Sequence, residues 1–299
     1  ANAAGLHRNI AIGYQTMANV GSNGPDDNIA LGYTALNDIT TGGYNVGIGS
    51  YVLENLTTGT DNVAVGFVAG RRITGTYNVS IGSYAHDYGY VSTKSVAIGY
   101  QSAQYSTGSF NTFVGYQAGR GGTNSAPYSS GTKNTALGYE ALIAFTTGYE
   151  NVAIGYEAGE SITSRSNNLF GAGAGDSLTT GRYNVAVGRS TLQTATNVDG
   201  CIAIGDQAMS YVNDASDVLV GVIGIGFGTL GDANGLKGHA DQSIAIGGSA
   251  GANASNLAKE FVIIGFSAGQ KINGGDITHI GYEAGQYASG SRNTFLGSG

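Results

Sequence analysis

Several residue types that mark common protein classes are scarce in this chain of 299 residues. There are two prolines, and the single cysteine, Cys201, excludes an intrachain disulfide framework. Charged residues make up only 11% of the chain, and a formal net charge of −7 argues against a nucleic-acid partner. The longest apolar run, at residues 218–223, is interrupted by Gly221 and is far shorter than the roughly 20 residues of a membrane-spanning helix. We therefore expect no membrane insertion.

Glycine, in contrast, is abundant, with 52 residues, and it recurs at regular intervals. The phrase Asn-Val-Ala-Ile-Gly-Tyr-Glu-Ala-Gly at residues 151–159 returns with variations along the whole chain, and an internal repeat of this kind dominates any reading of the fold. We align the copies on the glycine that ends Asn-Val-Ala-Ile-Gly and call it the closing glycine. The 17 copies, mostly 16 or 17 residues apart, have closing glycines at Gly13, Gly32, Gly49, Gly66, Gly82, Gly99, Gly115, Gly138, Gly155, Gly171, Gly188, Gly205, Gly221 or Gly226, Gly247, Gly265, Gly281 and Gly297.

The repeat also fixes an asparagine four residues before most closing glycines and an alanine three residues after many of them. Ser95, Cys201 and Ser243 replace that asparagine in three copies, and Phe261 and Ile277 replace it near the end. We expect these asparagines to lie at turns, to tolerate the left-handed backbone region, and to stack from copy to copy. The residues that we take to define the structural repeat are Asn45, Gly49, Asn62, Gly66, Asn151, Gly155, Asn184 and Gly188.

A 16–17-residue repeat of this composition predicts that each copy forms one turn of a β-solenoid. Valine, isoleucine and aromatic residues favour strands, whereas each interior glycine costs a helix about 1 kcal/mol. The closing glycine is expected to adopt a positive φ angle. We therefore predict an all-β fold: a parallel β-solenoid (a β-roll or β-helix) of about 17 coils that forms one elongated domain over residues 1–299.

Alternate side chains of a strand point in opposite directions, and in each repeat copy both sets are apolar, so the strand is apolar on both faces. Val152 and Ile154 share one face, and Ala153 lies on the other. We expect one face to fill the coil. We interpret the alanine face as a contact between chains, with the alternative that alanine simply occupies an exposed position.

The repeat becomes irregular near residues 83–94, 120–133 and 206–242. Insertions in a repeat scaffold map to loops, and loops often carry binding residues, so these regions are candidates for receptor contact. The alternative is tolerated variation in length without a ligand. The candidate receptor-binding residues are Tyr84, His86, Tyr88, Tyr90, Tyr128, Lys133, Lys237 and His239.

Glu140 and Glu157 lie one coil apart, where paired carboxylates would be able to perform acid–base work or bind a cation, but we interpret them as part of a solvated face. The sequence contains no other pattern that points to catalysis, metal binding or a cofactor. The glycine-rich segments at 171–175 and 224–228 follow from the repeat and precede no expected helix, so a nucleotide site is not predicted. The four histidines are widely separated and lack metal-ligand spacing. Cys201 stands in an asparagine position between apolar residues and reads as a buried small side chain rather than a nucleophile. We therefore expect a protein that is not an enzyme.

The phrase Asn-Val-Ala-Ile-Gly resembles the head repeats of trimeric autotransporter adhesins, which form left-handed parallel β-rolls. With Gly-Tyr-x-Ala-Gly and Thr-Thr-Gly-x-x-Asn, it is more similar still to repeats in bacteriophage tail fibres. The adhesin head units are typically shorter than 16–17 residues. The resemblance implies a homotrimeric rod, an extracellular location on a virion or cell surface, and attachment to a polysaccharide or protein receptor of a host cell. Separately, the chain begins at Ala1 before a repeat that is already running and stops at Gly299 within another, so we expect it to be a piece of a longer protein.

Two alternative functions remain open. Thr40-Thr41, Thr57-Thr58, Thr146-Thr147 and Thr179-Thr180 are intermittent threonine pairs that an ice-binding or other surface-binding solenoid would present as a flat array. A tailspike that degrades polysaccharide would need clustered carboxylates in a groove. Thermal hysteresis would indicate the first alternative, and turnover of a capsule polysaccharide would indicate the second.

Overall fold

The computed structural model describes residues 8–21, 24–122, 128–212, 218–231, 241–254 and 260–299. The chain divides into two compact units, residues 1–150 and 151–299. Over the described ranges every paired strand is parallel to its neighbour and no helix occurs. Each unit is a parallel β-solenoid, so the fold class expected from the repeat is confirmed.

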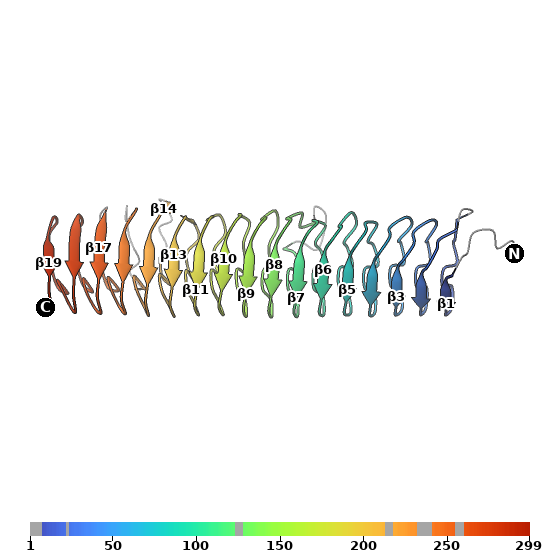
Figure 1. The fold of residues 1–299 in the computed structure, drawn as a ribbon, viewed down its shortest axis with the longest axis horizontal. Helices are drawn as coiled ribbons and strands as arrows, with labels where there is room; N and C mark the ends of the chain where they lie inside the picture. The colour runs from blue at the N-terminus through green and yellow to red at the C-terminus, as the bar shows by residue number, and fades with distance from the viewer. Residues whose placement is uncertain (1–7, 22–23, 123–127, 213–217, 232–240, 255–259) are drawn as a thin grey trace. The chain divides into compact units, whose positions relative to one another are not determined.

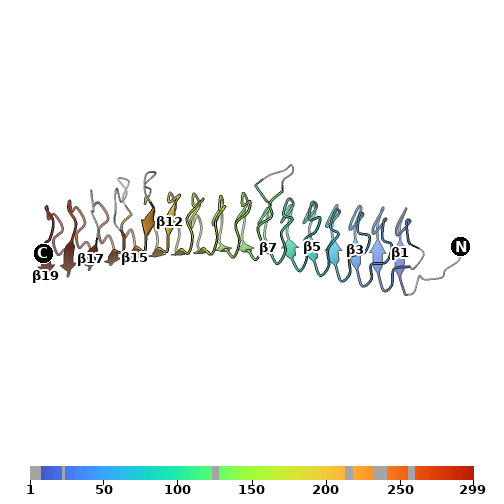
Figure 2. The same ribbon diagram turned by 90° about the horizontal axis from the view of Figure 1, so that it is seen from above.

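In the first unit each coil contributes one three-residue strand to a single parallel sheet (Figure 1). Equivalent residues of successive copies pair, so that Val46 lies opposite Val63 and Ile48 opposite Val65. Figure 2 shows the strands of this unit along one side of the coils and the turns along the other. The strands are β1 (Ile10–Ile12), β2 (Ile29–Leu31), β3 (Val46–Ile48), β4 (Val63–Val65), β5 (Val79–Ile81), β6 (Val96–Ile98), β7 (Thr112–Val114) and β8 (Thr135–Leu137).

The second unit repeats this arrangement and adds a small second sheet, in which β12 (Val198–Asp199) pairs with β14 (Leu219–Val220). The structure decides which glycine closes the copy that contains both Gly221 and Gly226. The Gly226 N–H donates to the carbonyl of Ile204, and Gly226 has a φ angle of 135°. Gly226 rather than Gly221 is therefore the closing glycine. The main strands are β9 (Val152–Ile154), β10 (Asn168–Phe170), β11 (Val185–Val187), β13 (Ile202–Ile204), β15 (Ile223–Ile225), β16 (Ile244–Ile246), β17 (Phe261–Ile264), β18 (Ile277–Ile280) and β19 (Thr294–Leu296).

The closing glycine is required by both conformation and space. Gly155 has a φ angle of 141°, a region that residues with a Cβ rarely adopt. A Cβ added at Gly155 would lie 2.5 Å from the carbonyl oxygen of Gly171, the closing glycine of the next coil. Successive closing glycines thus stack too closely for any side chain, which confirms the prediction of positive φ at these positions.

Each turn also contains non-glycine residues in the left-handed region, at positions the repeat did not reveal. They precede the aligned asparagine, or follow the closing glycine by two and four residues, as Tyr44, Tyr51 and Leu53 do with φ angles of 59°, 58° and 47°. The aligned asparagine does not use the left-handed region that we expected it to tolerate, since Tyr44 rather than Asn45 has that conformation. This alternation turns successive N–H groups toward opposite neighbours: Thr34 donates to Tyr14 of the preceding coil and Leu36 to Val52 of the following coil.

The coil interior is narrow and is lined by the small side chains of the strands. Ala153 is fully buried, whereas Val152 and Ile154 are only partly buried, so the alanine face points inward. Our interpretation of the alanine face as a contact between chains is therefore wrong. In the first unit, leucine and isoleucine side chains of the turns, such as Leu36, Ile39 and Leu53, fill the interior and leave room in most coils for only a small residue opposite.

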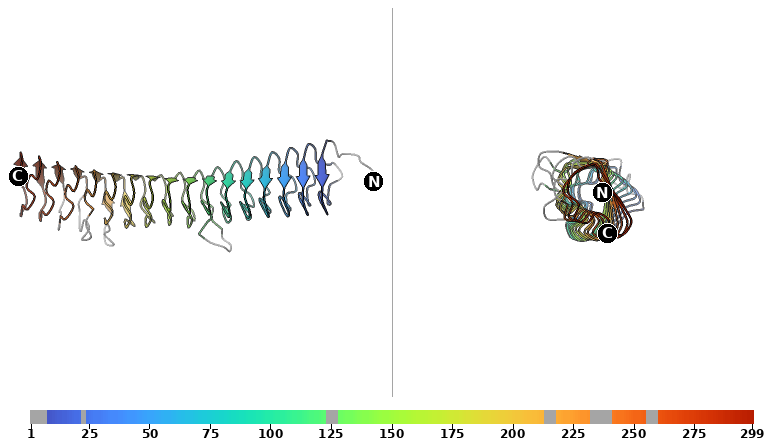
Figure 3. Two further views of the ribbon diagram at one scale, coloured as in Figure 1. Left: turned by 90° about the horizontal axis from the view of Figure 1, so that it is seen from below. Right: turned by 90° about the vertical axis from the view of Figure 1, so that its left-hand side faces the viewer.

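Where the inward position of a strand carries a bulky residue, a glycine in the turn of the same coil provides the space for it. Phe113 takes the inward position of β7, and a Cβ at Gly119 would lie 2.4 Å from its ring. Leu169 and Gly175 form the same pair in the second unit, where a Cβ added at the glycine would lie 2.9 Å from a leucine methyl. Interior volume is thus conserved from coil to coil, and within each unit successive coils overlie one another (Figure 3).

Candidate functional site

The aligned asparagines form a buried hydrogen-bonded column in the first unit. The Asn45 backbone N–H and side-chain Nδ2 both donate to Oδ1 of Asn28, at 2.9 and 3.0 Å, and Nδ2 also donates to the carbonyl of Gly59 at 2.9 Å. Asn62 makes the same bonds to Asn45 and to Gly75. The predicted stacking of the asparagines is therefore confirmed, and their role is structural.

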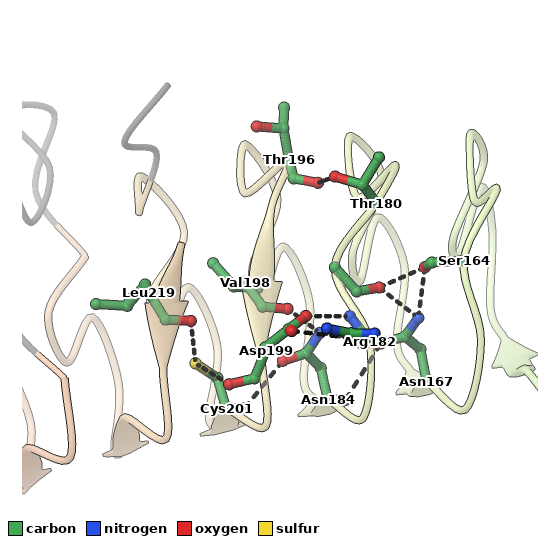
Figure 4. Close-up of polar contacts among 11 residues, drawn as sticks. Ser164, Asn167, Thr180, Arg182, Asn184, Thr196, Val198, Asp199, Cys201 and Leu219 are labelled. Carbon is green, nitrogen blue, oxygen red and sulfur yellow. Dashed lines mark hydrogen bonds and ion pairs between the residues drawn. The ribbon is translucent and has the colours of Figure 1, made fainter. Parts of the chain in front are cut away.

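In the second unit the column begins at Asn151, whose Oδ1 accepts the N–H of Asn167. It continues from Asn167 through Asn184 to Cys201 (Figure 4). The Cys201 N–H donates to Oδ1 of Asn184 at 2.9 Å, and its thiol makes long contacts of 3.7 Å with the carbonyls of Asp199 and Leu219, while the backbone N–H groups of Gly221 and Val222 lie against the sulfur. Burial raises the pKa of the Cys201 thiol to about 11, so this thiol is protonated at neutral pH. It has the environment of a structural cysteine.

The candidate receptor-binding residues occupy four different environments. The ring of Tyr84 lies between those of Phe67 and Tyr100 in an aromatic column beside the sheet. His86 is buried inside its coil, where Nδ1 lies 3.5 Å from the Ser80 hydroxyl, so this side chain presents no surface to a ligand.

The remaining candidates divide between an ion pair, a cluster and an undescribed segment. Lys133 forms an exposed ion pair with Glu150, with 3.0 Å between Nζ and Oε1. Tyr88, Tyr90 and Tyr128 converge on one patch of the first unit. Lys237 and His239 lie outside the described residues.

We define the tyrosine cluster as Tyr88, Tyr90, Tyr105 and Tyr128. Ring centroids are 5.2 Å apart for Tyr88 and Tyr105, 5.3 Å for Tyr88 and Tyr128, and 5.7 Å for Tyr90 and Tyr128. The rings of Tyr105 and Tyr128 are nearly parallel, with an interplanar angle of 5° and centroids 6.2 Å apart. Tyr90 is 38% exposed and the other three are half-buried, so the cluster retains a solvent-facing side.

Repeat geometry explains how the cluster forms. Tyr88 and Tyr105 each follow a closing glycine by six residues, so stacking of the coils brings their rings side by side. Tyr128 comes from the insertion at residues 120–133 and is held by its neighbour Ser129. The Ser129 hydroxyl donates to the carbonyl of Phe145 at 2.7 Å, and the Ser129 N–H donates to the carbonyl of Tyr105 at 3.1 Å. Sequence analysis did not identify Tyr105, although its position in the repeat matches that of Tyr88.

Arginines border the cluster. The Arg72 guanidinium carbon lies 4.1 Å from the centroid of the Tyr88 ring, a cation–π distance. Arg71 and Arg72 also pair with Asp87, at 3.0 and 3.4 Å, and the Asp87 side chain is only 2% exposed. Burial raises the pKa of the Asp87 carboxyl, and the two guanidinium groups oppose that rise.

Two phenols of the cluster, those of Tyr105 and Tyr128, have raised pKa values. The pKa of Tyr105 is raised mainly by burial and then by neighbouring Tyr88, and the pKa of Tyr128 mainly by burial and then by Tyr90. A protonated phenol both donates and accepts hydrogen bonds, and its ring offers an apolar face. The cluster therefore combines flat aromatic surface, hydroxyl groups and guanidinium groups. Among the described residues no group of three or more His, Cys, Asp or Glu side chains could hold a metal ion.

A second surface feature is a stripe of apolar side chains on the outward face of the sheet, which we call the outward stripe. It combines the outward residue just before each closing glycine with the aromatic residue that often follows it. The rings stack from coil to coil, as in Tyr116 and Tyr139, with centroids 5.0 Å apart, and Phe266 and Tyr282, at 5.8 Å. Members that are more than a third exposed include Ile48, Phe67, Ile81, Tyr100, Tyr116, Leu137 and Tyr139 in the first unit, and Phe170, Val187, Ile204, Phe227, Ile246, Phe266, Ile280 and Tyr282 in the second.

Comparison with family models, with curated proteins and with solved structures found no match. Within the part of the chain that the structure describes, there is also no helix long and apolar enough to cross a membrane. Interpretation of function therefore depends on the outward stripe, the tyrosine cluster and the sequence of the repeat.

Proposed function

We propose that this chain is a segment of a homotrimeric attachment fibre, in which three copies pack through their outward stripes and surface loops contact a host cell. The observation that carries the proposal is the outward stripe. It places large apolar side chains on the surface of coil after coil in both units. Soluble monomers rarely expose extended apolar surface of this kind, and such surface commonly marks a protein–protein interface.

The period of the stripe supports a second copy of this chain as the partner. The exposed residues recur once per coil because equivalent strand residues pair in register, as Ile48 does with Val65 and Ile81 with Ile98. A partner that covers such a surface needs the same period, and an identical chain has it. At about 25 cal/mol per Å², each 40 Å² of apolar surface covered contributes about 1 kcal/mol, so many coils acting together stabilise a complex strongly.

The attachment role is supported by the resemblance of the repeat to those of tail fibres and adhesins. A stack of short coils with hydrogen-bonded asparagine columns provides a scaffold that can carry loops, and the tyrosine cluster beside the insertion at 120–133 is the candidate contact region. In this proposal the fibre is extracellular, on a virion or a cell surface, and its target is a surface polysaccharide or protein. The chain acts by binding rather than by catalysis.

Sedimentation equilibrium of the purified chain tests the assembly. The expected mass is three times the 30.2 kDa of one chain, and a mass of 30.2 kDa at micromolar concentration would refute the trimer. Ile81→Lys places a charge in the outward stripe and should dissociate the complex. Tyr77→Lys is the matched control, because Tyr77 is 55% exposed and precedes an aligned asparagine, a position that Lys94 and Lys133 occupy in other coils.

A second candidate function, ice or mineral-surface binding, is favoured by one observation. Thr163, Thr179 and Thr196 form a column in the second unit, in which the Thr163 hydroxyl donates to the carbonyl of Thr179 at 3.0 Å and the Thr179 hydroxyl to that of Thr196 at 3.2 Å. Because these hydroxyl protons are used within the protein, the column presents mainly methyl groups and acceptor oxygens. Thermal hysteresis of the purified chain would support this function, and its absence at millimolar concentration would exclude it.

A further inference from the structure

We infer that the tyrosine cluster is a binding site for an acidic polysaccharide, whose pyranose rings lie against the tyrosine rings and whose carboxylates face the bordering arginines. This inference rests on the proposed attachment function and names its ligand class. Four tyrosines from two coils and one insertion meet with centroid separations of 5.2–6.4 Å, and they form the largest group of mutually contacting aromatic rings outside the outward stripe among the described residues.

The chemistry of the rings suits a sugar. One face of a pyranose carries C–H groups that pack on an aromatic ring, while its hydroxyl groups need polar partners around that contact. The tyrosine cluster supplies both, because each ring carries a phenol at its edge. Tyr90 presents the most exposed ring, at 38%, and Tyr128 stacks against it with an interplanar angle of 26°.

The charges around the cluster favour a carboxylate-bearing ligand. Three guanidinium groups interact electrostatically with the cluster or with Asp87, those of Arg71, Arg72 and Arg120. The acidic groups in the same electrostatic network are Asp87 and Glu54. These five groups leave one positive charge in a chain whose net charge is −7. The side chains of Arg71 and Arg72 are 25% and 29% exposed, whereas Asp87 is 2% exposed, so the guanidinium groups and not the carboxylate face solvent.

Architecture separates this cluster from the outward stripe. The strands lie on one side of the coils and the turns on the other (Figure 2), and the cluster belongs to the turns. Assembly of three chains through the sheet faces would therefore leave the cluster open to solvent. A ligand chain running along the stacked coils would meet Tyr88 and Tyr105 on adjacent turns.

The chain has no tryptophan, so its intrinsic fluorescence comes from its 19 tyrosines, four of which form the cluster. The test titrates the full chain with four acidic polymers, polygalacturonate, alginate, hyaluronate and polysialic acid, and with neutral dextran as the reference. We expect saturable quenching with at least one acidic polymer and at least tenfold weaker binding of dextran. Binding of none of the four acidic polymers, or equal binding of dextran, would overturn the inference.

Variants then locate the binding site. Tyr90→Ala and Tyr128→Ala should each weaken binding fivefold to tenfold, Tyr90→Phe should keep most of the affinity because it keeps the ring, and Arg72→Gln should reduce the preference for acidic polymers. Tyr77→Ala is the matched control, an exposed tyrosine of the same unit outside the cluster, and should bind as the unmodified chain does. Affinity of Tyr90→Ala equal to that of Tyr77→Ala would overturn the assignment.

Mass and melting temperature of each variant separate loss of the site from loss of the fold. A chain that remains trimeric and attaches to cells as well with Tyr90→Ala and Tyr128→Ala as without them would refute the saccharide site and leave the proposed fibre intact. A monomeric chain that still binds an acidic polymer through the cluster would refute the fibre and keep the site. The two proposals can therefore fail independently.

Discussion

The second unit contains two versions of the same buried column, and they differ in how backbone polar groups are satisfied. From Asn151 to Asn184 the column is made of asparagines, each of which accepts the N–H of the next residue in the column. From Val222 to Ile277 it is largely apolar, and Val222, Phe261 and Ile277 are all buried. The same coil geometry therefore tolerates either a polar column that satisfies itself or an apolar one.

The strands show the structural consequence of this difference. Coils with asparagine have three-residue strands such as β11, whereas β17 and β18 begin one residue earlier, at Phe261 and Ile277, which pair directly. Where the asparagine Oδ1 accepts the backbone N–H of the next residue in the column, the strand begins only at the residue after the asparagine. Phe261 has no side-chain acceptor for the N–H of Ile277, and there the ladder extends by one residue. The N–H of Phe261 itself is accepted by the Ser243 hydroxyl at 3.1 Å, because Ser243 takes the place of an asparagine in the preceding coil.

The largest expected effect concerns what both versions share, the closing glycine. Gly155→Val requires a β-branched residue at a φ angle of 141° and places its Cβ 2.5 Å from a backbone oxygen. We expect a loss of at least about 4 kcal/mol in the free energy of unfolding, or failure to fold. Urea denaturation measures it, with Gly200→Ala as the control, because no atom lies within 4 Å of a Cβ there. An unchanged denaturation midpoint would contradict the stacked-glycine geometry.

Breaking the polar column should have the next largest effect. Asn167→Leu keeps the volume but removes the Oδ1 that accepts from both the N–H and the Nδ2 of Asn184, whereas the carbonyl of Gly181 keeps the Ser164 hydroxyl as a donor. At about 1–3 kcal/mol for each buried unsatisfied group, we expect a loss of about 3–5 kcal/mol. Ile277→Leu in the apolar version is the matched control and should cost less than about 1.5 kcal/mol. Equal losses in the two variants would show that the asparagines contribute packing rather than hydrogen bonds.

His86 offers a third case, a buried polar side chain that is only partly satisfied. Its Nε2 has no hydrogen-bond partner in the described structure, and burial lowers the pKa of His86 from 6.5 to about 4. Because the folded pKa is depressed, the unfolded chain binds a proton first as pH falls. Stability is therefore full above about pH 6.5 and declines toward pH 4, by about 3 kcal/mol in total.

His86→Leu should remove most of this pH dependence, since leucine occupies the same position in other coils, as at Leu53. Melting temperatures between pH 7 and pH 4 measure the effect. Burial also lowers the pKa of His279, so we expect this histidine to cause the decline in melting temperature that remains in the variant at low pH. A variant whose melting temperature falls with pH as steeply as that of the unmodified chain would rule out His86 as the source.

The smallest expected effect sits at the junction between the two versions of the column. Cys201→Asn would replace a thiol whose contacts are 3.7 Å long with an amide that can donate to Leu219 and accept from the N–H of Val222, which now lies against the sulfur. We expect a gain of about 1 kcal/mol. Calorimetry checks it, and a Cys201→Ser variant should gain less. A loss of stability would show that the site lacks room for the amide.

Repeat spacing alone was sufficient to predict the parallel solenoid, the stacking of Asn45 on Asn28, and the positive φ angle of Gly155. It could not predict which strand face is inward, because that depends on the space that Leu36 and Ile39 leave inside the coil. The left-handed conformation of Tyr44 has no sequence signal, since tyrosine does not favour that region.

The tyrosine cluster was only partly predictable. Tyr88 and Tyr90 stood out because their copy departs from the repeat, and Tyr128 because it lies in an insertion. Tyr105 lies in a regular copy and joins the cluster only through coil stacking. The insertion is held near the coil of Tyr88 by the hydrogen bonds of Ser129, and no local sequence pattern indicates these bonds.

In-register pairing of equivalent residues also bears on how such a chain changes its length. Excision of residues 46–62 would join Asn45 to Val63 and present to each remaining neighbour the same donors and acceptors that it meets now. Recombination between segments that encode equivalent turns could therefore add or remove whole turns without creating a mismatched edge. Selection can then adjust reach in steps of one turn while the chemistry of each layer stays fixed.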